Sequence, residues 1–178
     1  MDFDNITIEI CDDLPDRTVL DDMLADYYEP FVALMRGLGA PVSREELQSA
    51  QDEFWTNAAD YMPPRGAVAL ARNELGQLIG LCNLKRLDAQ SGELKRLYVK
   101  NEFRRKGLGS ELLTALVSQA SELGIARLIA EILNPDLGGM LITLGFEKCS
   151  SPLETTTSKN YPILRPHLQT FVKKLTET

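Results

Sequence analysis

Apolar residues recur with regular periods over most of the chain, and the period changes from segment to segment. Apolar and polar residues alternate over 6–10, which predicts a half-buried strand. Over 16–36, apolar residues recur at steps of three and four, which predicts a helix that 37–41 ends with two glycines and a proline. Residues 43–46, Ser-Arg-Glu-Glu, have the pattern of a capping box and predict a second helix that continues to about Ala59.

Three strand-like segments occupy the middle of the chain. Residues 67–72 and 78–84 are apolar and strand-like, residues 93–99 form a third strand-like segment, and short turns with glycine separate the three at 73–77 and 89–92. Such short connections are typical of antiparallel hairpins. We therefore expect these strands to form a meander.

Helix and strand patterns then alternate. Apolar residues on one face predict a strong helix over 108–123, with Gly124 as its C-terminal cap. An apolar run at 126–133 predicts a buried strand. Asn134-Pro135 then begins a short helix, because asparagine is favoured at the N-cap and proline in the first turn. Gly138-Gly139 weakens this helix by about 1 kcal/mol per glycine, unless the backbone must approach a ligand there.

The end of the chain completes the predicted order of elements. Residues 146–149 begin another strand, 150–165 predict a loop rich in Ser, Thr and Pro, and 168–175 return as a final strand. The order is β, α, α, β, β, β, α, β, α, β, followed by that last strand. Antiparallel neighbours and later βαβ crossovers indicate an α/β (mixed α+β) fold, with a mixed six- to seven-stranded sheet and helices on both faces. We expect residues 1–178 to form a single domain, since no linker or repeat is visible.

Composition narrows the class of protein. Of the 178 residues, 44% are hydrophobic and 25% are charged, which is typical of a globular protein. The three cysteines are far apart and lack a CxxC or histidine-pair context, which argues against a disulfide framework and a zinc site. The net charge of -7 disfavours nucleic acid and mildly favours cationic partners. The first ten residues do not resemble a signal sequence, so we expect a cytoplasmic protein with no membrane partner.

The candidate binding chemistry lies in the loop before the helix predicted over 108–123. Backbone N–H groups at the start of a helix lack intrahelical partners, and the helix dipole is positive there, so this end attracts anions. Two glycines let the backbone approach a diphosphate closely, and three consecutive cations add charge-assisted hydrogen bonds. The predicted diphosphate-binding loop consists of Arg104, Arg105, Lys106, Gly107, Leu108, Gly109 and Ser110.

Two familiar phosphate loops do not fit this segment. No Gly-Lys-Ser/Thr closes it as in a P-loop, and Leu112 occupies the third glycine position of a dinucleotide fingerprint. A kinase and a dehydrogenase are therefore disfavoured. A basic surface loop that only precedes a helix is the alternative interpretation, because charge runs are often solvated faces.

The loop and its flanks resemble the GNAT superfamily of N-acetyltransferases. The shared loop of that superfamily is Arg or Gln, two residues, Gly, one residue, then Gly or Ala, and the segment that begins at Arg104 has this spacing. Residues 93–99, Glu-Leu-Lys-Arg-Leu-Tyr-Val, resemble the preceding strand in a bacterial branch of the superfamily. Residues 144–146, Leu-Gly-Phe, resemble its usual ending for the helix after strand five. The likeness covers about residues 66–149.

The resemblance implies acetyl-CoA as cosubstrate and no metal. In the superfamily, the strand before the loop pairs through its backbone with the pantetheine arm, which implies cofactor contacts from Leu97, Tyr98 and Val99. The same three residues also fit an ordinary strand core. The resemblance further implies a contact between Asn134 and the CoA arm, whereas an N-cap role explains Asn134 without any ligand.

The resemblance also implies a catalytic role for Glu93. In several histone acetyltransferase-like members, the general base is a glutamate eleven residues before the first loop residue, and Glu93 has this spacing from Arg104. A lysine-like amine has a pKa of about 10.4, so an acceptor of this kind must lose a proton before or during its attack. An ion pair of Glu93 with Lys95 or Arg96 is the alternative interpretation.

The sequence departs from the superfamily at the leaving group. Aligned from Asn134, the tyrosine that protonates the CoA thiolate in many members is replaced by Leu141. A thiol has a pKa of about 8.5 and leaves tolerably as a thiolate, so this loss is not decisive. Tyr161 is a candidate substitute. Four acids of the first helix either line the acceptor side or form a solvated face, namely Asp21, Asp22, Asp26 and Glu29.

Together these features predict an N-acetyltransferase that transfers the acetyl group of acetyl-CoA to a primary amine of a small molecule or amino acid. Two alternatives stay open: a non-catalytic acyl-CoA-binding or sensing module, and an acetyltransferase for protein lysines or N-termini. The expected partner is a small-molecule amine, and no nucleic acid is expected. A homodimer stays open.

Overall fold

One mixed sheet organises the molecule. The computed structural model describes residues 5–40, 42–151, 153 and 155–175. Within these ranges seven strands form a sheet in the order β1-β2-β3-β4-β5-β7-β6. As far as the structure describes this sheet, β4 and β5 are the only neighbouring strands that run parallel, and all other neighbours run antiparallel. The strands are β1 (Thr7–Ile10), β2 (Gly66–Arg72), β3 (Leu78–Arg86), β4 (Ser91–Val99), β5 (Arg127–Ile132), β6 (Glu147–Lys148) and β7 (Gln169–Lys174).

Helices connect these strands in the predicted order, so the predicted fold class is confirmed. The α-helices are α1 (Arg17–Gly37), α2 (Arg44–Thr56), α3 (Leu108–Glu122), α4 (Leu137–Thr143) and α5 (Thr156–Asn160). Three short 3₁₀ helices are η1 (Ala58–Tyr61), η2 (Asn101–Phe103) and η3 (Pro162–His167). None of the helices in the described ranges is long and apolar enough to cross a membrane.

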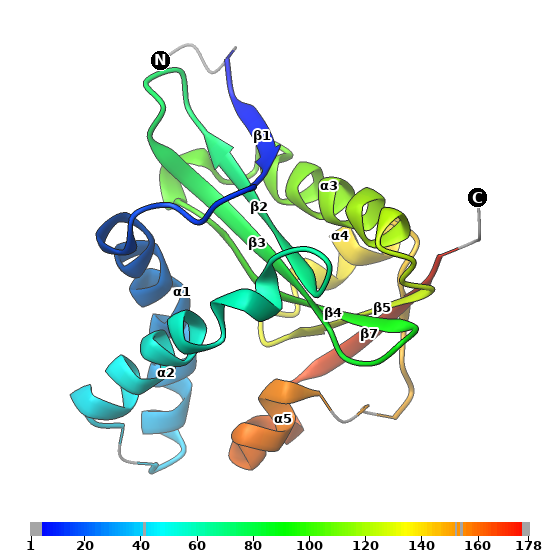
Figure 1. Cartoon of the computed structure of the whole chain (residues 1–178). Coiled ribbons are helices and arrows are strands. Elements are labelled where there is room, and N and C mark those ends of the chain that lie inside the picture. The colour runs from blue at the N-terminus through cyan, green and yellow to red at the C-terminus, as the bar shows by residue number, and fades with distance from the viewer. Residues whose placement is uncertain (1–4, 41, 152, 154, 176–178) are drawn as a thin grey trace.

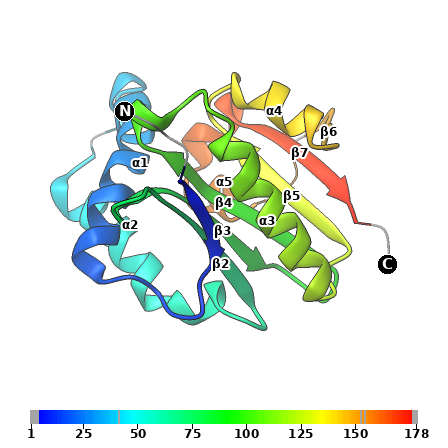
Figure 2. The ribbon, with the colours of Figure 1, turned by 90° about the horizontal axis from the view of Figure 1, so that it is seen from above.

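The helices divide between the two faces of the sheet. α3 and α4 lie on one face, which we call the α3 face, and α1, α2 and α5 lie on the other, which we call the α1 face (Figure 1, Figure 2). On the α3 face, alanines of β2 leave room for leucines of α3 such as Leu112 and Leu116. On the α1 face, Leu20 and Leu24 of α1 pack against Leu81 of β3. Each face therefore has an apolar core of its own.

The first two helices begin where the sequence predicts. Asp16 caps α1 by accepting a hydrogen bond from the backbone N–H of Thr18. Ser43 and Glu46 form the predicted capping box at the start of α2. The second helix is shorter than predicted: it ends at Thr56, because the side-chain amide of Asn57 donates to the carbonyl oxygen of Glu53 at 2.8 Å and η1 follows. Pro41, part of the predicted stop of α1, lies outside the described residues.

Two further predictions need correction. Asn134 is not the N-cap of α4, because its side-chain oxygen accepts from the backbone N–H of Asp136 at 3.0 Å and the helix begins only at Leu137. Such local side-chain hydrogen bonds compete with helix formation. Residues 150–165 do not form a simple loop, because α5 and the start of η3 lie there and Thr155 and Ser158 form a capping box. Residues 152 and 154 of that segment lie outside the described residues.

The two glycines of α4 have different surroundings. A Cβ at Gly138 would lie 3.1 Å from the ring of Phe171, so this glycine lets α4 approach β7 closely. A Cβ at Gly139 would meet nothing within 4 Å. Close packing against Phe171, rather than approach to a ligand, therefore accounts for Gly138.

Candidate active site

The parallel strands β4 and β5 pair over only part of their length. Their register runs from Ser91 opposite Arg127 to Leu94 opposite Ala130, whereas β4 continues to Val99. Beyond Leu94, β4 keeps its pairing with β3 on its other side. Within the described residues, the edge of β4 that faces β5 is thus without a strand partner from 95 to 99. This unpaired edge includes Leu97, Tyr98 and Val99, which were predicted to contact the cofactor, and it offers backbone groups that an extended ligand can pair with as an added strand.

A bulge shapes β4 at this point. The register with β3 shifts between Leu81 and Asn83, and Arg96 has a φ of 54°. A left-handed conformation costs a residue other than glycine roughly 1–3 kcal/mol, so the surrounding contacts must hold it. The buried guanidinium of Arg96 donates to Tyr61 at 2.7 Å, to Tyr28 at 3.0 Å and to the Glu53 carboxylate at 3.1 Å. Arg96 therefore ties the bulge to α1, α2 and η1.

The predicted diphosphate loop lies at the start of α3. Arg105 has a φ of 60°, and Gly107 has a φ of 86° and is the N-cap of α3. No side chain of the described residues caps this end of the helix. The first-turn N–H groups are therefore not used by a side-chain cap, and the exposed loop brings cationic side chains to the positive end of the helix dipole. An exposed helix start with these properties suits a diphosphate.

The structure gives individual positions to the other loop residues. The guanidinium Nε of Arg104 donates to the carbonyl oxygen of Val99 at 2.7 Å, so this side chain links the loop to the end of β4. Lys106 donates to the carbonyl oxygen of Glu102 at 3.3 Å. Leu108 is buried in the α3-face core, whereas Gly109 and Ser110 are half-buried in the first turn of α3. Gly109 lies beside α4, because a Cβ there would be 3.4 Å from the sulfur of Met140.

Glu93 lies within β4, on the α1 face, and is only 1% exposed. Its Oε1 is 3.6 Å from Nζ of Lys95, and its Oε2 accepts a hydrogen bond from Thr156 of α5 at 2.6 Å. Burial lowers the pKa of Lys95, while the charge of Glu93 acts in the opposite direction. The pairing with Lys95 that the sequence left open is therefore present, whereas the catalytic role stays a prediction.

Four polar residues cross the α1 face beside Glu93, one from each of four strands. Asn83 of β3 pairs with Lys95 of β4, and Glu131 of β5 pairs with Thr170 of β7. Lys95 and Glu131 each follow directly on the last paired positions of β4 and β5. We call Asn83, Lys95, Glu131 and Thr170 the polar row.

The polar row escaped prediction from the sequence, because a row across four strands depends on register. Glu131 did leave a signal. Within the run 126–133 that predicted a buried strand, it is the only charged residue after Arg127 at the start. A single charge in such a run is unusual for a core position, since a buried charge needs a partner.

The other candidate residues belong to different elements of the fold. Leu141 belongs to the α3-face core, so it contributes only apolar packing. Tyr161, at the C-terminal end of α5, is half-buried, and burial raises the pKa of its phenol, with Tyr28 and Glu53 adding to the rise. Among the acids of α1, Asp26 accepts a hydrogen bond from the Tyr98 hydroxyl at 3.1 Å.

The remaining acids of α1 are Asp21, Asp22 and Glu29. Asp21 accepts from the indole N–H of Trp55 at 2.6 Å and from Arg17 at 3.0 Å, which joins α1 to α2. Asp22 and Glu29 are exposed. No group of three His, Cys, Asp or Glu side chains that could hold a metal occurs in the ranges that the structure describes.

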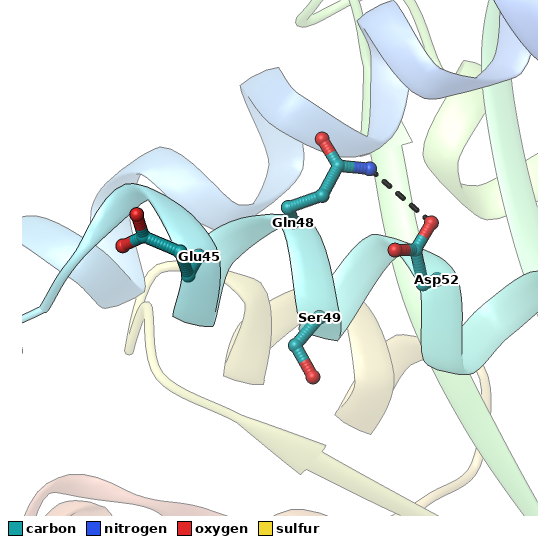
Figure 3. Close-up of a pocket in the computed structure, with 4 residues that line it drawn as sticks. All are labelled: Glu45, Gln48, Ser49 and Asp52. Atoms are coloured by element: carbon teal, nitrogen blue, oxygen red, sulfur yellow. Dashed lines mark hydrogen bonds between the residues drawn. The ribbon is translucent and has the colours of Figure 1, made fainter.

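A surface hollow on α2 is separate from these residues. Glu45, Gln48, Ser49 and Asp52 line it, and Gln48 donates to Asp52 at 3.2 Å (Figure 3). All four side chains come from one helix, and the first three are exposed. None of the predicted site residues lines this hollow, so we assign it no part in the chemistry.

The sheet and its helices thus form an α/β protein in which an incompletely paired β4–β5 strand pair lies in the same fold as a helix start capped by Gly107. The sequence profile of the Acetyltransferase (GNAT) family matches residues 20–140. The chain belongs to this family. An uncharacterised N-acetyltransferase of Schizosaccharomyces pombe is 30% identical to it over 89 residues, which are 49% of this chain and 55% of that protein. The chain thus spans about half the length of this curated relative.

Solved structures share the fold. The N-acetylglutamate synthase of Neisseria gonorrhoeae, complexed with coenzyme A and N-acetyl-glutamate, superimposes with a TM-score of 0.61 at 23% identity, over 96% of this chain and 35% of that one. A GNAT family acetyltransferase from Elizabethkingia anophelis with acetyl-CoA bound has a TM-score of 0.61 at 21% identity, over 97% of this chain and 99% of that one. At these identities the likeness shows the fold alone.

Proposed function

We propose that the chain is an N-acetyltransferase that transfers the acetyl group of acetyl-CoA to a primary amine of a small molecule or amino acid. The observation that carries the proposal is the end of β4–β5 pairing at Leu94 and Ala130, next to the glycine-capped start of α3. The two features offer an unpaired strand edge for an amide-bearing arm and a helix start for a diphosphate. Pantetheine diphosphate has both groups, in sequence.

Different groups of residues would bind different parts of the cosubstrate. The backbone of Leu97, Tyr98 and Val99 would pair with the pantetheine arm. The first-turn amides of α3 and the cations of the loop would hold the diphosphate. When bound, acetyl-CoA supplies an acyl group on a thioester. In this proposal Asn134 is a further contact to the arm, with its side chain already turned toward the backbone of Asp136.

The acceptor would lie on the α1 face of the sheet. The polar row is on that face, together with Glu93, Arg96 and the hydroxyl of Tyr28. Donors and acceptors of this kind suit a small polar amine, since a substrate site pairs buried polar groups with those of its ligand. The structurally similar synthase bound to N-acetyl-glutamate makes amino acids the first acceptors to test.

Protons must leave the amine and reach the thiolate. Glu93 is the carboxylate that the sequence resemblance assigns to the first task, and its two oxygens already contact Lys95 and Thr156. Leu141 cannot protonate a thiolate, whereas the Tyr161 phenol carries a proton at neutral pH, and burial raises its pKa further. We propose that solvent or Tyr161 supplies the thiol proton.

Two measurements on the purified chain test this proposal. Calorimetry with acetyl-CoA should give saturable binding that Arg104→Ala weakens. A thiol-release assay with a panel of amino acids, polyamines and simple amines should then show at least one acceptor that releases CoA above the rate of hydrolysis. Absence of acetyl-CoA binding would overturn the whole proposal.

Leu141 favours one alternative, a CoA-binding module without catalysis. Binding of acetyl-CoA with no thiol release from any member of the panel would support that module instead. Release with a peptide that bears a lysine or a free N-terminus, and with none of the small amines, would indicate a protein acceptor. Each outcome keeps the donor site and changes only the acceptor.

A further inference from the structure

The polar row contains unsatisfied hydrogen-bonding groups. Four buried side-chain atoms have no hydrogen-bond partner within the part of the protein that the structure describes: both amide atoms of Asn83, Oε1 of Glu131 and Oγ1 of Thr170. All four belong to the row, and Asn83 is 0% exposed. Leaving such a group unpaired costs about 1–3 kcal/mol. Their concentration in one row across β3, β5 and β7 indicates that the row is built to meet a polar ligand.

The two carboxylates of this region differ in how their oxygens are used. Both oxygens of Glu93 contact the protein, through Lys95 and Thr156. Glu131 uses only Oε2, which accepts a hydrogen bond from the Thr155 hydroxyl, and its Oε1 contacts no donor of the described residues. Glu131 is also half-buried, whereas Glu93 is 1% exposed. Glu131 is therefore the carboxylate that keeps one buried oxygen without a partner among the described residues, which a ligand bound there would satisfy.

The position of Glu131 relates it to the donor site. It directly follows Ala130, the last β5 residue that pairs with β4, so it lies where the two strands cease to pair. Lys95, the first β4 residue beyond the pairing, occupies the matching position on the other strand. If the thioester lies along the unpaired edge of β4, as the proposed function requires, Glu131 faces the same region from the opposite strand.

We infer that Glu131 is a catalytic residue whose Oε1 contacts the acceptor amine and takes a proton from it. The inference rests on the proposed function. An ammonium acceptor loses two protons as its nitrogen forms the bond to the carbonyl carbon and the C–S bond breaks. One proton ends on the thiol of CoA and the other passes through Glu131 to solvent, so the step balances. Glu93 then holds Lys95 and Thr156 in place and acts as a positioning residue.

The surroundings of Glu131 suit a proton acceptor. Burial raises its pKa most, the hydrogen bond from Thr155 opposes this rise, Glu93 adds to it and Lys95 opposes it. A carboxylate with a raised pKa binds a proton more strongly and is a better base near neutral pH. The charged groups that face it are thus Glu93 and Lys95 of β4, and α5 contributes the Thr155 hydroxyl.

The decisive experiment compares Glu131→Gln with Glu147→Gln, an exposed residue of β6. With the fastest amine of the panel, Glu131→Gln should lower kcat/KM by about 100-fold or more, since general bases contribute about 10²- to 10⁴-fold. Its acetyl-CoA affinity, measured by calorimetry, should stay within about twofold of wild type. Glu147→Gln should change neither value. Glu131→Asp, which keeps the carboxylate, should restore part of the lost activity.

Two readouts separate catalysis from a structural role. In wild type, kcat/KM should fall on the acid side with a pKa above the ordinary value of about 4.3 for glutamate, and Glu131→Gln should lack this fall. Thr155→Val removes the hydrogen bond to Glu131 but keeps the carboxylate, so it should retain the acid-side fall. Independently of turnover, ¹³C NMR of glutamate-labelled protein should show the Glu131 carboxyl titrating above that ordinary value, and its signal should shift when the amine is added with CoA.

Other results would overturn the inference. If Glu131→Gln keeps wild-type turnover and Glu93→Gln loses it, the base is Glu93 and the proposed function stands. If Thr155→Val loses as much activity as Glu131→Gln, with the same pH profile, Glu131 acts only by anchoring α5. If wild type binds acetyl-CoA but transfers the acetyl group to no amine, the proposed function and this inference both fail. The NMR titration would still measure the pKa of the Glu131 carboxyl in that case.

Discussion

The two faces of the sheet are built from different kinds of residue. The α3-face core consists of apolar side chains, with Leu112, Leu116 and Phe171 among its members. Every buried polar or charged residue of the described ranges lies on the α1 face or on a helix that covers it. These residues are Gln51, Asn83, Ser91, Glu93, Arg96, Thr155, Ser158 and Thr170.

The two faces of the sheet differ in what they contribute to stability and to the chemistry of the site. Burial of apolar surface on the α3 face stabilises the fold by about 25 cal/mol per Å². The α1 face places unpaired polar atoms in the interior, which opposes folding. Features that oppose folding, such as these unpaired polar atoms, occur in proteins chiefly at functional sites. We therefore expect substitutions in the α3-face core to change stability and those in the polar row of the α1 face to change activity.

The largest expected effect is on the α3 face. Leu112→Ala removes a fully buried side chain that lies beside Gly80 and should lower the free energy of unfolding by about 2–5 kcal/mol, because it leaves a cavity. Urea unfolding measures this change. The folded variant should keep its acetyl-CoA affinity. Leu75→Ala, at a residue that is 75% exposed, is the control and should shift stability by no more than about 0.5 kcal/mol. A Leu112→Ala protein of wild-type stability would contradict the assignment of this face.

Glu93→Gln tests whether one α1-face residue also supports the fold. Removing its charge takes from the largely buried Lys95 its ion-pair partner, which should lower stability by about 3 kcal/mol at neutral pH. The pKa of Lys95 already lies below its ordinary value, so its neutral form gains as pH rises. The stability gap to wild type should therefore narrow toward the ordinary lysine pKa of about 10.4. Thermal unfolding from pH 7 to pH 10 measures this, and a gap that widens with pH would rule out Lys95 as its cause.

Substitutions of two glycines, Gly107 in the loop and Gly139 in α4, test whether the loop binds the diphosphate. Gly107→Ala places a Cβ at a φ of 86°, which costs about 1–2 kcal/mol and disturbs the start of α3. Acetyl-CoA affinity should fall about tenfold by calorimetry, equivalent to about 1.4 kcal/mol. Gly139→Ala is the matched control, since its Cβ meets nothing, and it should stabilise α4 by about 1 kcal/mol without loss of affinity. Equal affinities in the two variants would exclude the loop from diphosphate binding.

The smallest expected effect is that of Asn83→Leu, which should keep or slightly raise stability and weaken binding of the acceptor. Asn83→Leu replaces a buried amide without partners by an apolar side chain of similar size, so stability should stay the same or rise by about 1 kcal/mol. The KM for the acceptor should rise, because the polar row loses a hydrogen-bonding group. Thermal unfolding and steady-state kinetics measure the two changes. A large loss of stability would mean that Asn83 has a structural role.

The sequence predicted what depends on local pattern. The periodicity over 108–123, the capping box at Ser43 and the spacing from Arg104 to Gly109 all describe features within a few neighbouring residues. The structure confirms the resulting elements and their order. Local rules succeeded there because helix caps and amphipathic stripes are themselves local interactions.

The parts that escaped prediction depend on contacts between distant segments. The polar row exists only because the strand register brings Asn83 opposite Lys95 and Glu131 opposite Thr170. α5 lies in a segment whose Ser, Thr and Pro content indicates a loop, yet Thr155 caps it and also binds Glu131. No pattern within one segment encodes either contact.

The hydrogen bond from Arg104 to the carbonyl oxygen of Val99 has a mechanical consequence. It joins the first residue of the loop to the last residue of β4, so under the proposed function it fixes the loop for the diphosphate relative to the strand edge for the pantetheine arm. A contact within the protein therefore fixes the spacing between the loop and the end of β4. Under the proposed function, a donor with a shorter or longer arm would match only the loop or only the strand edge, so this hydrogen bond would favour donors of one arm length.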